Sequence, residues 1–302
     1  MTSVARSIVK SVLSREQMDG VGARVYRSIG TPALRNLDPF LMLDEFDMNN
    51  PGAAFLDHPH RGFETVTFMK EGEFEHEDFK GNKGRLGPGD LQWMTAGRGI
   101  VHAEVPIQGT KRVHGLQLWV NLGKKDKLIE PSYQEFPKEK VVRIHPKEGL
   151  EIGVIAGQSY GAQSPVFTRT PTMFIDVKMK KGVTMDQNIP EDYRGFIYTL
   201  NGKASFGETK HIAEAHHTLV LSDHGNTIPI ESLSDDCEFV IIAGLPHNEP
   251  IVQHGPFVMN TKEEIYQAFE DYQRGQNGFE GAPEFESELK KKYEKNNRRL
   301  FF

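Results

Sequence analysis

Histidines and a glutamate occur at close spacing in two places in the first half of the chain. His58 and His60 stand two apart in the segment DHPHRGFE, and His102 and Glu104 stand two apart in GRGIVHAE. Residues i and i+2 of a β-strand project from the same face, so each pair would point into one interior. Two histidines that are buried together need polar partners, and a metal ion is one such partner. The spacing therefore predicts a metal site built from both pairs.

The donor set of this predicted site is three neutral ring nitrogens and one carboxylate. Such a set suits Fe(II), Mn(II), Ni(II), Cu(II) or Zn(II), and the residues alone do not choose among them. Three or four protein ligands leave coordination positions for water, O₂ or a substrate. A purely structural metal is the least favoured interpretation, because structural sites are normally closed by four strong ligands.

Short β-strands must position these residues. Runs of β-branched and aromatic residues alternate with turn residues, drawn from 29 glycines and 17 prolines. This pattern occurs over residues 20–122 and again over residues 150–245. Strands at such spacing are typical of β-sandwiches and barrels. Residues 123–140 are polar and contain proline, which indicates a linker between two β-rich halves.

The two ends of the chain carry different signals. The first residues are basic and rich in serine, as in a transit peptide, but the alternation over residues 8–13 favours a strand. Near the other end, Thr261 and Glu264 form a capping box, and Gly275 marks the stop of a predicted helix. Residues 287–302 read as a charged tail, either a solvated helix or disordered, and its KKK and RR groups are a weaker candidate for a nuclear-import signal.

The composition excludes several classes of function. The net charge is −6, and no long basic stripe exists that would neutralise the phosphates of a nucleic acid. No apolar run approaches the length of a membrane span. The one cysteine, Cys237, allows neither an internal disulfide nor a thiolate metal cage, which fits a reducing compartment such as the cytosol or nucleus.

The first histidine pair lies in a longer pattern of glycines and acids. The spacing of Gly52, His58, His60, Glu64 and Gly72 resembles the first cupin motif, with a final gap one residue longer than usual. The later segment GDLQWMTAGRGIVHAE resembles an altered second cupin motif. One HxH is a weak signal, whereas HxH with flanking glycines and a later HAE is a strong one.

Six segments carry a closer resemblance to the animal-type members of the pirin family: LSREQMDGVGARVYRSIG, LDPFLMLDEF, DHPHRGFETV, GDLQWMTAGRGIVHAE, HGLQLWVNL and QHGPFVMNT. The resemblance implies an all-β fold of two tandem cupin β-barrels with a C-terminal helix. It also implies one Fe²⁺ per chain in the N-terminal barrel, and a monomer. We expect a metal-binding domain over residues 1–135, a metal-free domain over 136–280 and a charged tail over 281–302.

The family's ligand pattern can be transferred residue by residue. Carried onto this chain, it implies the iron ligands His58, His60, His102 and Glu104. Ordinary cupins use the glutamate of the first motif, here Glu64, but the family pattern places the carboxylate two residues after the third histidine. We therefore expect Glu64 to support the site by orienting a histidine N–H or by pairing with Arg61.

Four other histidines, His114, His216, His217 and His254, fit a metal site less well. His114 is a further candidate metal ligand, but its position favours a polar strand residue. His216 and His217 are adjacent, so on a strand they would point to opposite faces. His254 has no partner at ligand spacing. These residues predict that the second barrel binds no metal.

The family resemblance implies quercetin (flavonol) 2,3-dioxygenase activity, which consumes O₂ and a small phenolic substrate. Glu104 would then accept the proton of the flavonol hydroxyl as a general base when it loosens from the metal. Phe63, Trp93 and Met94 are candidates for an apolar pocket lining, although each also fits a plain core position.

The resemblance also implies an alternative of another class. The protein would be an iron- and redox-dependent transcriptional co-regulator that binds NF-κB-type transcription factors, without relevant catalysis, in the nucleus and cytoplasm. The acidic composition suits a basic protein surface and not DNA itself.

Overall fold

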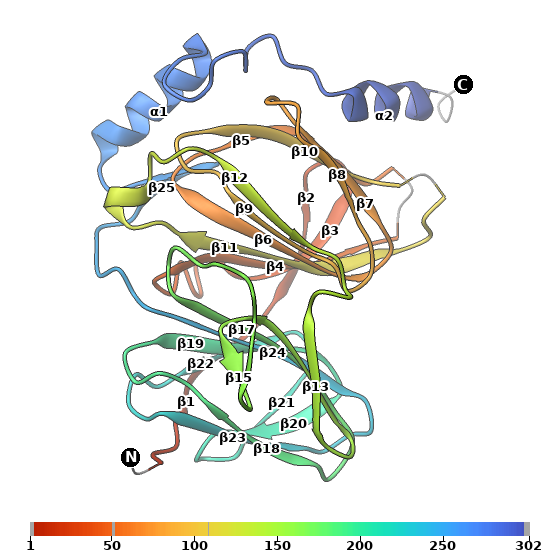
Figure 1. The fold of residues 1–302 in the computed structure, drawn as a ribbon, viewed down its shortest axis with the longest axis vertical. Coiled ribbons are helices and arrows are strands. Elements are labelled where there is room, and N and C mark those ends of the chain that lie inside the picture. The colour runs from red at the N-terminus through yellow and green to blue at the C-terminus, as the bar shows by residue number, and fades with distance from the viewer. Residues whose placement is uncertain (1–2, 50–51, 108, 299–302) are drawn as a thin grey trace. The chain divides into compact units, whose positions relative to one another are not determined.

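The computed structural model describes residues 3–49, 52–107 and 109–298, and most of this chain forms β-strands (Figure 1). The predicted all-β class is confirmed. Among the described residues, no helix combines the length and the apolar character that crossing a membrane requires. Residues 299–302 of the predicted tail lie outside the described part of the chain.

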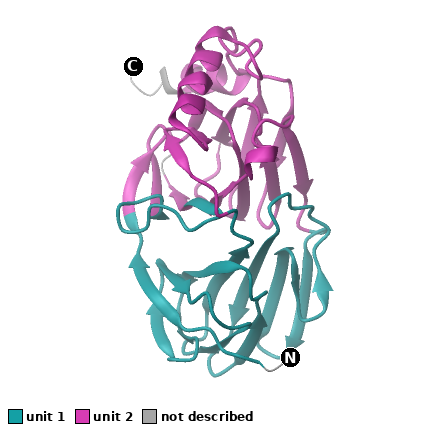
Figure 2. Cartoon of the chain, turned by 90° about the vertical axis from the view of Figure 1, so that its left-hand side faces the viewer, with its two compact units in different colours: residues 1–15, 28–42, 139–247 teal, residues 16–27, 43–138, 248–302 magenta. Residues whose placement is uncertain are grey.

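The chain forms two compact units that are not contiguous in sequence (Figure 2). Unit 1 contains residues 1–15, 28–42 and 139–247, and unit 2 contains residues 16–27, 43–138 and 248–302. This division differs from the predicted boundaries 1–135 and 136–280. The first strand pairs with a strand of the second half of the chain, in unit 1. The C-terminal helices pack on strands of unit 2, which is built mainly from the first half of the chain.

Unit 2 holds two sheets. The larger has the strand order β12-β9-β6-β11-β4-β3-β2. In that order its strands are Ser132–Phe136, Leu91–Thr95, Phe63–Glu71, Val113–Asn121, Phe40–Met48, Ala23–Ile29 and Arg15–Asp19. The smaller has the order β5-β10-β7-β8, with strands Phe55–His60, Ile100–Pro106, Phe74–Asp78 and Lys83–Leu86. The smaller sheet carries both predicted ligand pairs, the first on β5 and the second on β10.

The predicted linker over residues 123–140 is only partly correct. A short 3₁₀ helix, Lys124–Asp126, begins it. The segment SYQEF then forms β12, which pairs antiparallel with β9 along its whole length. An edge strand needs only one partner, so a polar segment with two aromatic residues, Tyr133 and Phe136, is enough to form it.

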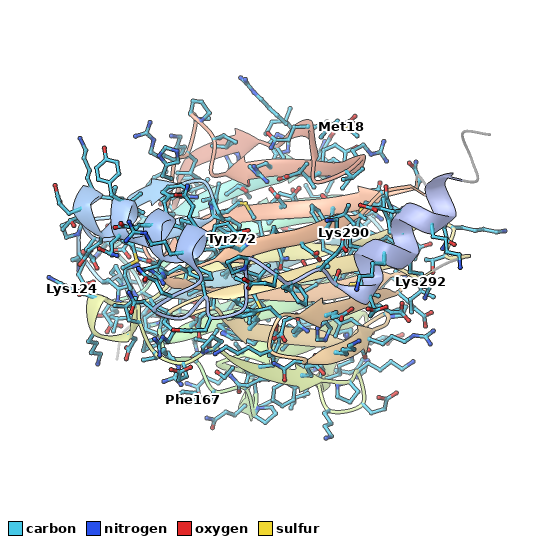
Figure 3. The ribbon with its side chains drawn as sticks, turned by 90° about the horizontal axis from the view of Figure 1, so that it is seen from above. Met18, Lys124, Phe167, Tyr272, Lys290 and Lys292 are labelled. Atoms are coloured by element: carbon cyan, nitrogen blue, oxygen red, sulfur yellow. The ribbon has the colours of Figure 1, made fainter. Side chains whose placement is uncertain are left out.

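The C-terminal segment of unit 2 contains the hairpin β25 (Val252–His254) and β26 (Phe257–Met259), followed by two helices. Helix α1, Lys262–Arg274, has the predicted capping box between Thr261 and Glu264. It ends at Gly275, whose φ of 61° is the left-handed conformation that glycine adopts without strain. Helix α2, Glu288–Arg298, packs against β5, β7 and β10, and Figure 3 marks it at Lys290 and Lys292.

Unit 1 forms the second barrel. Its larger sheet has the order β1-β22-β19-β24-β17-β14-β13, with strands Ile8–Leu13, His217–Leu221, Arg194–Asn201, Cys237–Gly244, Thr172–Met179, Leu150–Ala156 and Val142–Lys147. Its smaller sheet has the order β18-β23-β20-β21, with strands Thr184–Asn188, Thr227–Ser232, Lys203–Phe206 and His211–Glu214. A hairpin of β15 (Gln158–Ser159) and β16 (Ala162–Gln163) completes it. The predicted N-terminal strand is confirmed as β1, and one buried hydrophobic cluster includes residues from both sheets.

Candidate metal centre

Three of the four predicted ligands converge inside unit 2. Strands β5 and β10 pair antiparallel with His102 directly opposite His58, while His60 is opposite Ile100. The ring centroids of His58 lie 4.7 Å from those of His60 and 4.5 Å from those of His102, and the last two are 5.1 Å apart. One ligand atom from each histidine lies within 4.8 Å of the others, which is the spacing that a shared metal ion requires.

A backbone hydrogen bond fixes the orientation of His58. Its Nδ1 lies 2.8 Å from the carbonyl oxygen of Leu56, where Nδ1–H is the donor. That tautomer leaves Nε2 with its lone pair available as the ligand atom. Metal-binding histidines usually hold their second nitrogen in this way.

His60 and His102 are buried, with exposed fractions of 3% and 0%. Both nitrogens of His102 and the Nδ1 of His60 have no hydrogen-bond partner among the described residues. The pKa of each ring lies well below its usual range. Burial is the main cause, and the nearby His58 is the second. Neutral buried imidazoles without partners are costly in a protein core. A metal ion would satisfy them, so these residues fit the predicted group.

Glu104 is buried on β10, but the atoms that lie within 4.8 Å of one another are those of the three histidines alone. Its carboxylate accepts hydrogen bonds from Thr67 Oγ1 at 3.3 Å and from Gln117 Nε2 at 3.1 Å. Burial raises its pKa, while His58 and His76 act in the opposite direction. Its role as a metal ligand stays a prediction. Thr67 and Gln117 had not been expected at the site, because nothing in their local sequence distinguishes them.

We expected Glu64 to support the histidines, and it lies on a different strand from His60. Strand β5 ends at His60, and β6 begins at Phe63 after a turn in which Gly62 has a φ of 89°. Alternation therefore does not continue from one strand to the next. Glu64 instead accepts a hydrogen bond from Thr95 Oγ1 at 2.7 Å.

The predicted pairing of Arg61 with Glu64 is wrong. Arg61 Nη1 lies 2.7 Å from Asp271 Oδ2 on helix α1, and both side chains are 3% exposed. Its other guanidinium nitrogens donate to the carbonyl oxygens of Arg98 and Asn277. Since Asp271 is 210 residues away in sequence, local spacing gave no sign of this contact.

An aromatic pair borders the histidines. The ring of His60 lies 5.1 Å from that of Phe63 and 5.2 Å from that of Trp119, and these two rings stack at 4.3 Å. Trp119 had not been expected here, although its segment HGLQLWV alternates as a strand does. Trp93 and Met94 are fully buried, and Met94 belongs to a small aliphatic cluster, so their role as pocket lining stays a prediction.

The other histidines lie in different settings. His114 Nε2 lies 2.8 Å from Glu45 Oε1, in agreement with a polar strand residue. His216 lies at a turn with a φ of 64°, and His217 begins β22. The ring of His254 packs 5.2 Å from Phe269. The absence of a metal from the second barrel stays a prediction.

Comparison with known proteins agrees with this architecture. Residues 22–120 match the family model described as Pirin, and residues 174–278 match the Pirin C-terminal cupin domain. The chain is 52% identical over 284 residues to a pirin-like protein of Solanum lycopersicum, which covers 93% of this chain and 96% of that one. It is 50% identical over 289 residues to Pirin of Homo sapiens, covering 94% of this chain and 98% of that one.

A solved structure extends the likeness to three dimensions. Quercetin 2,3-dioxygenase from Acinetobacter baumannii superimposes with a TM-score of 0.85 at 33% identity, covering 91% of this chain and 99% of that chain. The predicted two-cupin fold is confirmed by the two family matches and by this superposition. On the two family matches and the identities to its relatives, the chain belongs to the pirin family.

Proposed function

We propose that this protein is an iron-dependent quercetin (flavonol) 2,3-dioxygenase. The observation that carries the proposal is the group of three histidines, two of them buried with ring nitrogens that have no hydrogen-bond partner. The likeness to a quercetin 2,3-dioxygenase over nearly the whole chain supports the choice of substrate class.

In this proposal His58, His60 and His102 hold the ion, and Glu104 is the fourth ligand. Bound iron would supply a Lewis acid for the flavonol oxygens and a redox centre for O₂. The chain supplies the geometry. His58 is oriented by Leu56, and the antiparallel register sets His102 opposite His58. The neutral state of the buried rings keeps their lone pairs ready for the ion.

Glu104 has a second role, as the acceptor of the flavonol hydroxyl proton once its carboxylate has loosened from the ion. Thr67 and Gln117 hold one carboxylate oxygen each, so the side chain is oriented before substrate arrives. Without the ion, burial raises the pKa of this carboxyl group, so a carboxylate released from the iron is a stronger base than one in water. The stacked rings of Phe63 and Trp119 provide apolar surface beside His60, which suits a flat phenolic ring.

Oxygen uptake tests the proposed reaction. Protein loaded anaerobically with Fe²⁺ should consume O₂ when quercetin and air are admitted, and the product should lack the visible absorption band of the flavonol. His58→Ala should abolish this uptake. His114→Ala is the matched control, because His114 lies on another strand against Glu45 and should leave uptake unchanged. Iron-loaded protein that binds quercetin without consuming O₂ would contradict a dioxygenase.

The alternative is an iron- and redox-dependent co-regulator of NF-κB-type transcription factors in the nucleus and cytoplasm. It uses the same histidines, and the net charge of −6 favours a basic protein partner over DNA. Iron that cycles between oxidation states without quercetin-dependent uptake, together with partner binding that follows the oxidation state, would favour this function.

A further inference from the structure

A large cavity opens at one end of the barrel in unit 1, a unit that holds none of the three histidines. Its volume is about 910 Å³, which is within the usual size range of small-molecule sites. Met173 and Ile189 line it and also belong to the buried core cluster of the barrel. The floor of the cavity is therefore the end of the core, in the position where barrels commonly bind ligands.

The hairpin β15–β16 forms one wall of the cavity, and the edge strand β18 contributes Asp186, Gln187 and Asn188 to the lining. The hydroxyl of Tyr160, at the tip of the hairpin, accepts a hydrogen bond of 3.2 Å from the backbone N–H of Asp186 on β18. Deeper in the cavity, Ser159 Oγ donates to Gln187 Oε1 at 2.6 Å, and both side chains are buried. These two contacts fix the hairpin and the strand relative to each other.

The loop over residues 190–193 forms another wall, and a buried arginine holds it. Arg6 is 0% exposed, and its guanidinium donates to the carbonyl oxygens of Pro190 at 2.7 Å, Tyr193 at 2.8 Å and Gly225 at 2.9 Å. Hydrogen bonds from a charged donor to buried carbonyls are strong. The loop is therefore set in place without a ligand, and a site with prepared walls loses less entropy on binding.

The polar side chains around the cavity are mainly amides and hydroxyls. Five amides line it: Gln158, Gln163, Gln187, Asn188 and Asn226. Its described lining includes no lysine, arginine or histidine, and it includes two carboxylates. One of these, Glu191, already accepts a hydrogen bond from Asn226 Nδ2 at 3.2 Å, and the charge of Arg6 lies close behind it. Gln187 and Asn226 are held by contacts within the protein, with Ser159 and with Glu191. The neutral donors and acceptors offered to a ligand are therefore mainly those of Gln158, Gln163 and Asn188, and the lining disfavours anions.

We propose that this cavity binds a neutral polyhydroxylated small molecule of sugar size. Amides and hydroxyls match the alternating donor and acceptor character of sugar hydroxyls. The rings of Tyr160 and Tyr193 offer apolar faces with a polar edge, which suits the mixed surface of a sugar ring. The proposal does not depend on the iron site or on the proposed dioxygenase.

The test is a ¹H–¹⁵N NMR titration of the full-length protein with individual sugars: glucose, galactose, mannose, xylose, cellobiose and sucrose, each to tens of millimolar. At least one should give saturable shifts confined to residues 157–163 and 186–193, with a Kd on the order of 1 mM, as expected for about 4 kcal/mol of binding energy. Spermidine is the cationic comparison, and citrate is the anionic one.

Variants make the test specific to the cavity. Gln187→Met keeps the length of the side chain but breaks its contact with Ser159, which fixes the hairpin against β18, and should weaken binding at least tenfold. Asn188→Ala, at an exposed wall position, should also weaken binding and avoids any folding defect at the floor. Asn201→Ala, at the opposite end of the same barrel, is the matched control and should leave the Kd unchanged. Saturable shifts with spermidine alone, or no shifts at these residues with any sugar, would overturn the proposal.

Discussion

Arg61, the residue after His60, forms a buried ion pair with Asp271 of helix α1 at 2.7 Å. Asp271 is otherwise satisfied, because Oδ1 accepts from the amides of Gln267 and Asn277. The pair therefore fixes the turn after strand β5, which carries His58 and His60, to helix α1 within unit 2.

Removing one partner of this pair should be costly. Asp271→Ala leaves the Arg61 charge buried without a counter-ion, and we expect a loss of about 3–5 kcal/mol in the free energy of unfolding of unit 2. Both tryptophans, Trp93 and Trp119, lie in unit 2, so their fluorescence in a denaturant titration reports on that unit. The control is Glu270→Ala, which breaks the exposed pair with Arg274 and should cost less than about 0.5 kcal/mol. Equal effects of the two changes would contradict the account.

Lys127 gives a prediction about pH. It is 1% exposed, its Nζ donates to the carbonyl oxygens of Gly62 and Val258, and burial lowers its pKa from 10.5 to about 8. Between these two values the unfolded chain holds a proton that the folded chain lacks, so the Lys127 contribution to stability rises with pH across the window and is lost as pH falls through 8.

Comparison with Lys127→Met isolates this contribution, because all other titrations cancel. The difference in unfolding free energy, wild type minus variant, should increase between pH 8 and pH 10.5 by about 1.4 kcal/mol for each unit of pKa difference. A difference that is flat or falls with pH over this window would show that the folded structure does not lower the pKa of Lys127.

Glu104→Gln separates base chemistry from metal binding. The amide keeps the length of the side chain and one oxygen that accepts from Gln117, and its NH₂ can donate to Thr67 Oγ1, whose proton then goes to Gln117 Oε1. Most of the iron should therefore remain bound. The amide cannot take up the flavonol proton, and quercetin-dependent oxygen uptake should fall by about 10²–10⁴-fold. Uptake at the wild-type rate in iron-loaded Glu104→Gln would mean that another group accepts the proton.

Helix α2 should support the histidine strand from outside the barrel. The backbone N–H of Ser287, just before α2, donates to Asp57 Oδ2 at 3.1 Å, and that of Leu289 donates to Glu77 Oε2 at 3.2 Å. Asp57 directly precedes His58 in sequence. Deletion of residues 286–302 removes both bonds, at about 1 kcal/mol each.

Amide hydrogen exchange over residues 55–60 should therefore accelerate tenfold or more in the deletion variant, and iron should be lost faster to a chelator. Lys291→Ala breaks only the exposed pair with Glu288 and serves as the control. Unchanged exchange in the deletion variant would show that α2 is only a solvated tail.

The sequence was informative where the chemistry is local. The histidines and the helix signals at Thr261, Glu264 and Gly275 depend on spacing within one element, and the structure places them as expected. The expected pairing of Glu64 with Arg61 was wrong, because Arg61 pairs with Asp271 and Glu64 accepts a hydrogen bond from Thr95. Contacts between distant segments, such as Arg61 with Asp271, arise only from the three-dimensional fold and leave no periodic trace in the sequence.

The sequence did not predict that the N-terminal strand belongs to unit 1 and the C-terminal helices to unit 2, for the same reason. Strand β1 pairs with β22, more than 200 residues further along the chain, and only the paired structure reveals that partner. Strand β12 was read as part of a linker because a polar edge strand resembles a loop in composition.

Metal analysis of the purified protein tests the central claim most directly. After anaerobic loading with Fe²⁺ and removal of excess metal, the wild-type protein and His114→Ala should each retain about one iron per chain. His60→Ala and His102→Ala should retain almost none, while circular dichroism shows that both stay folded. Iron retained equally by all four proteins, or by none of them, would contradict a metal centre at His58, His60 and His102.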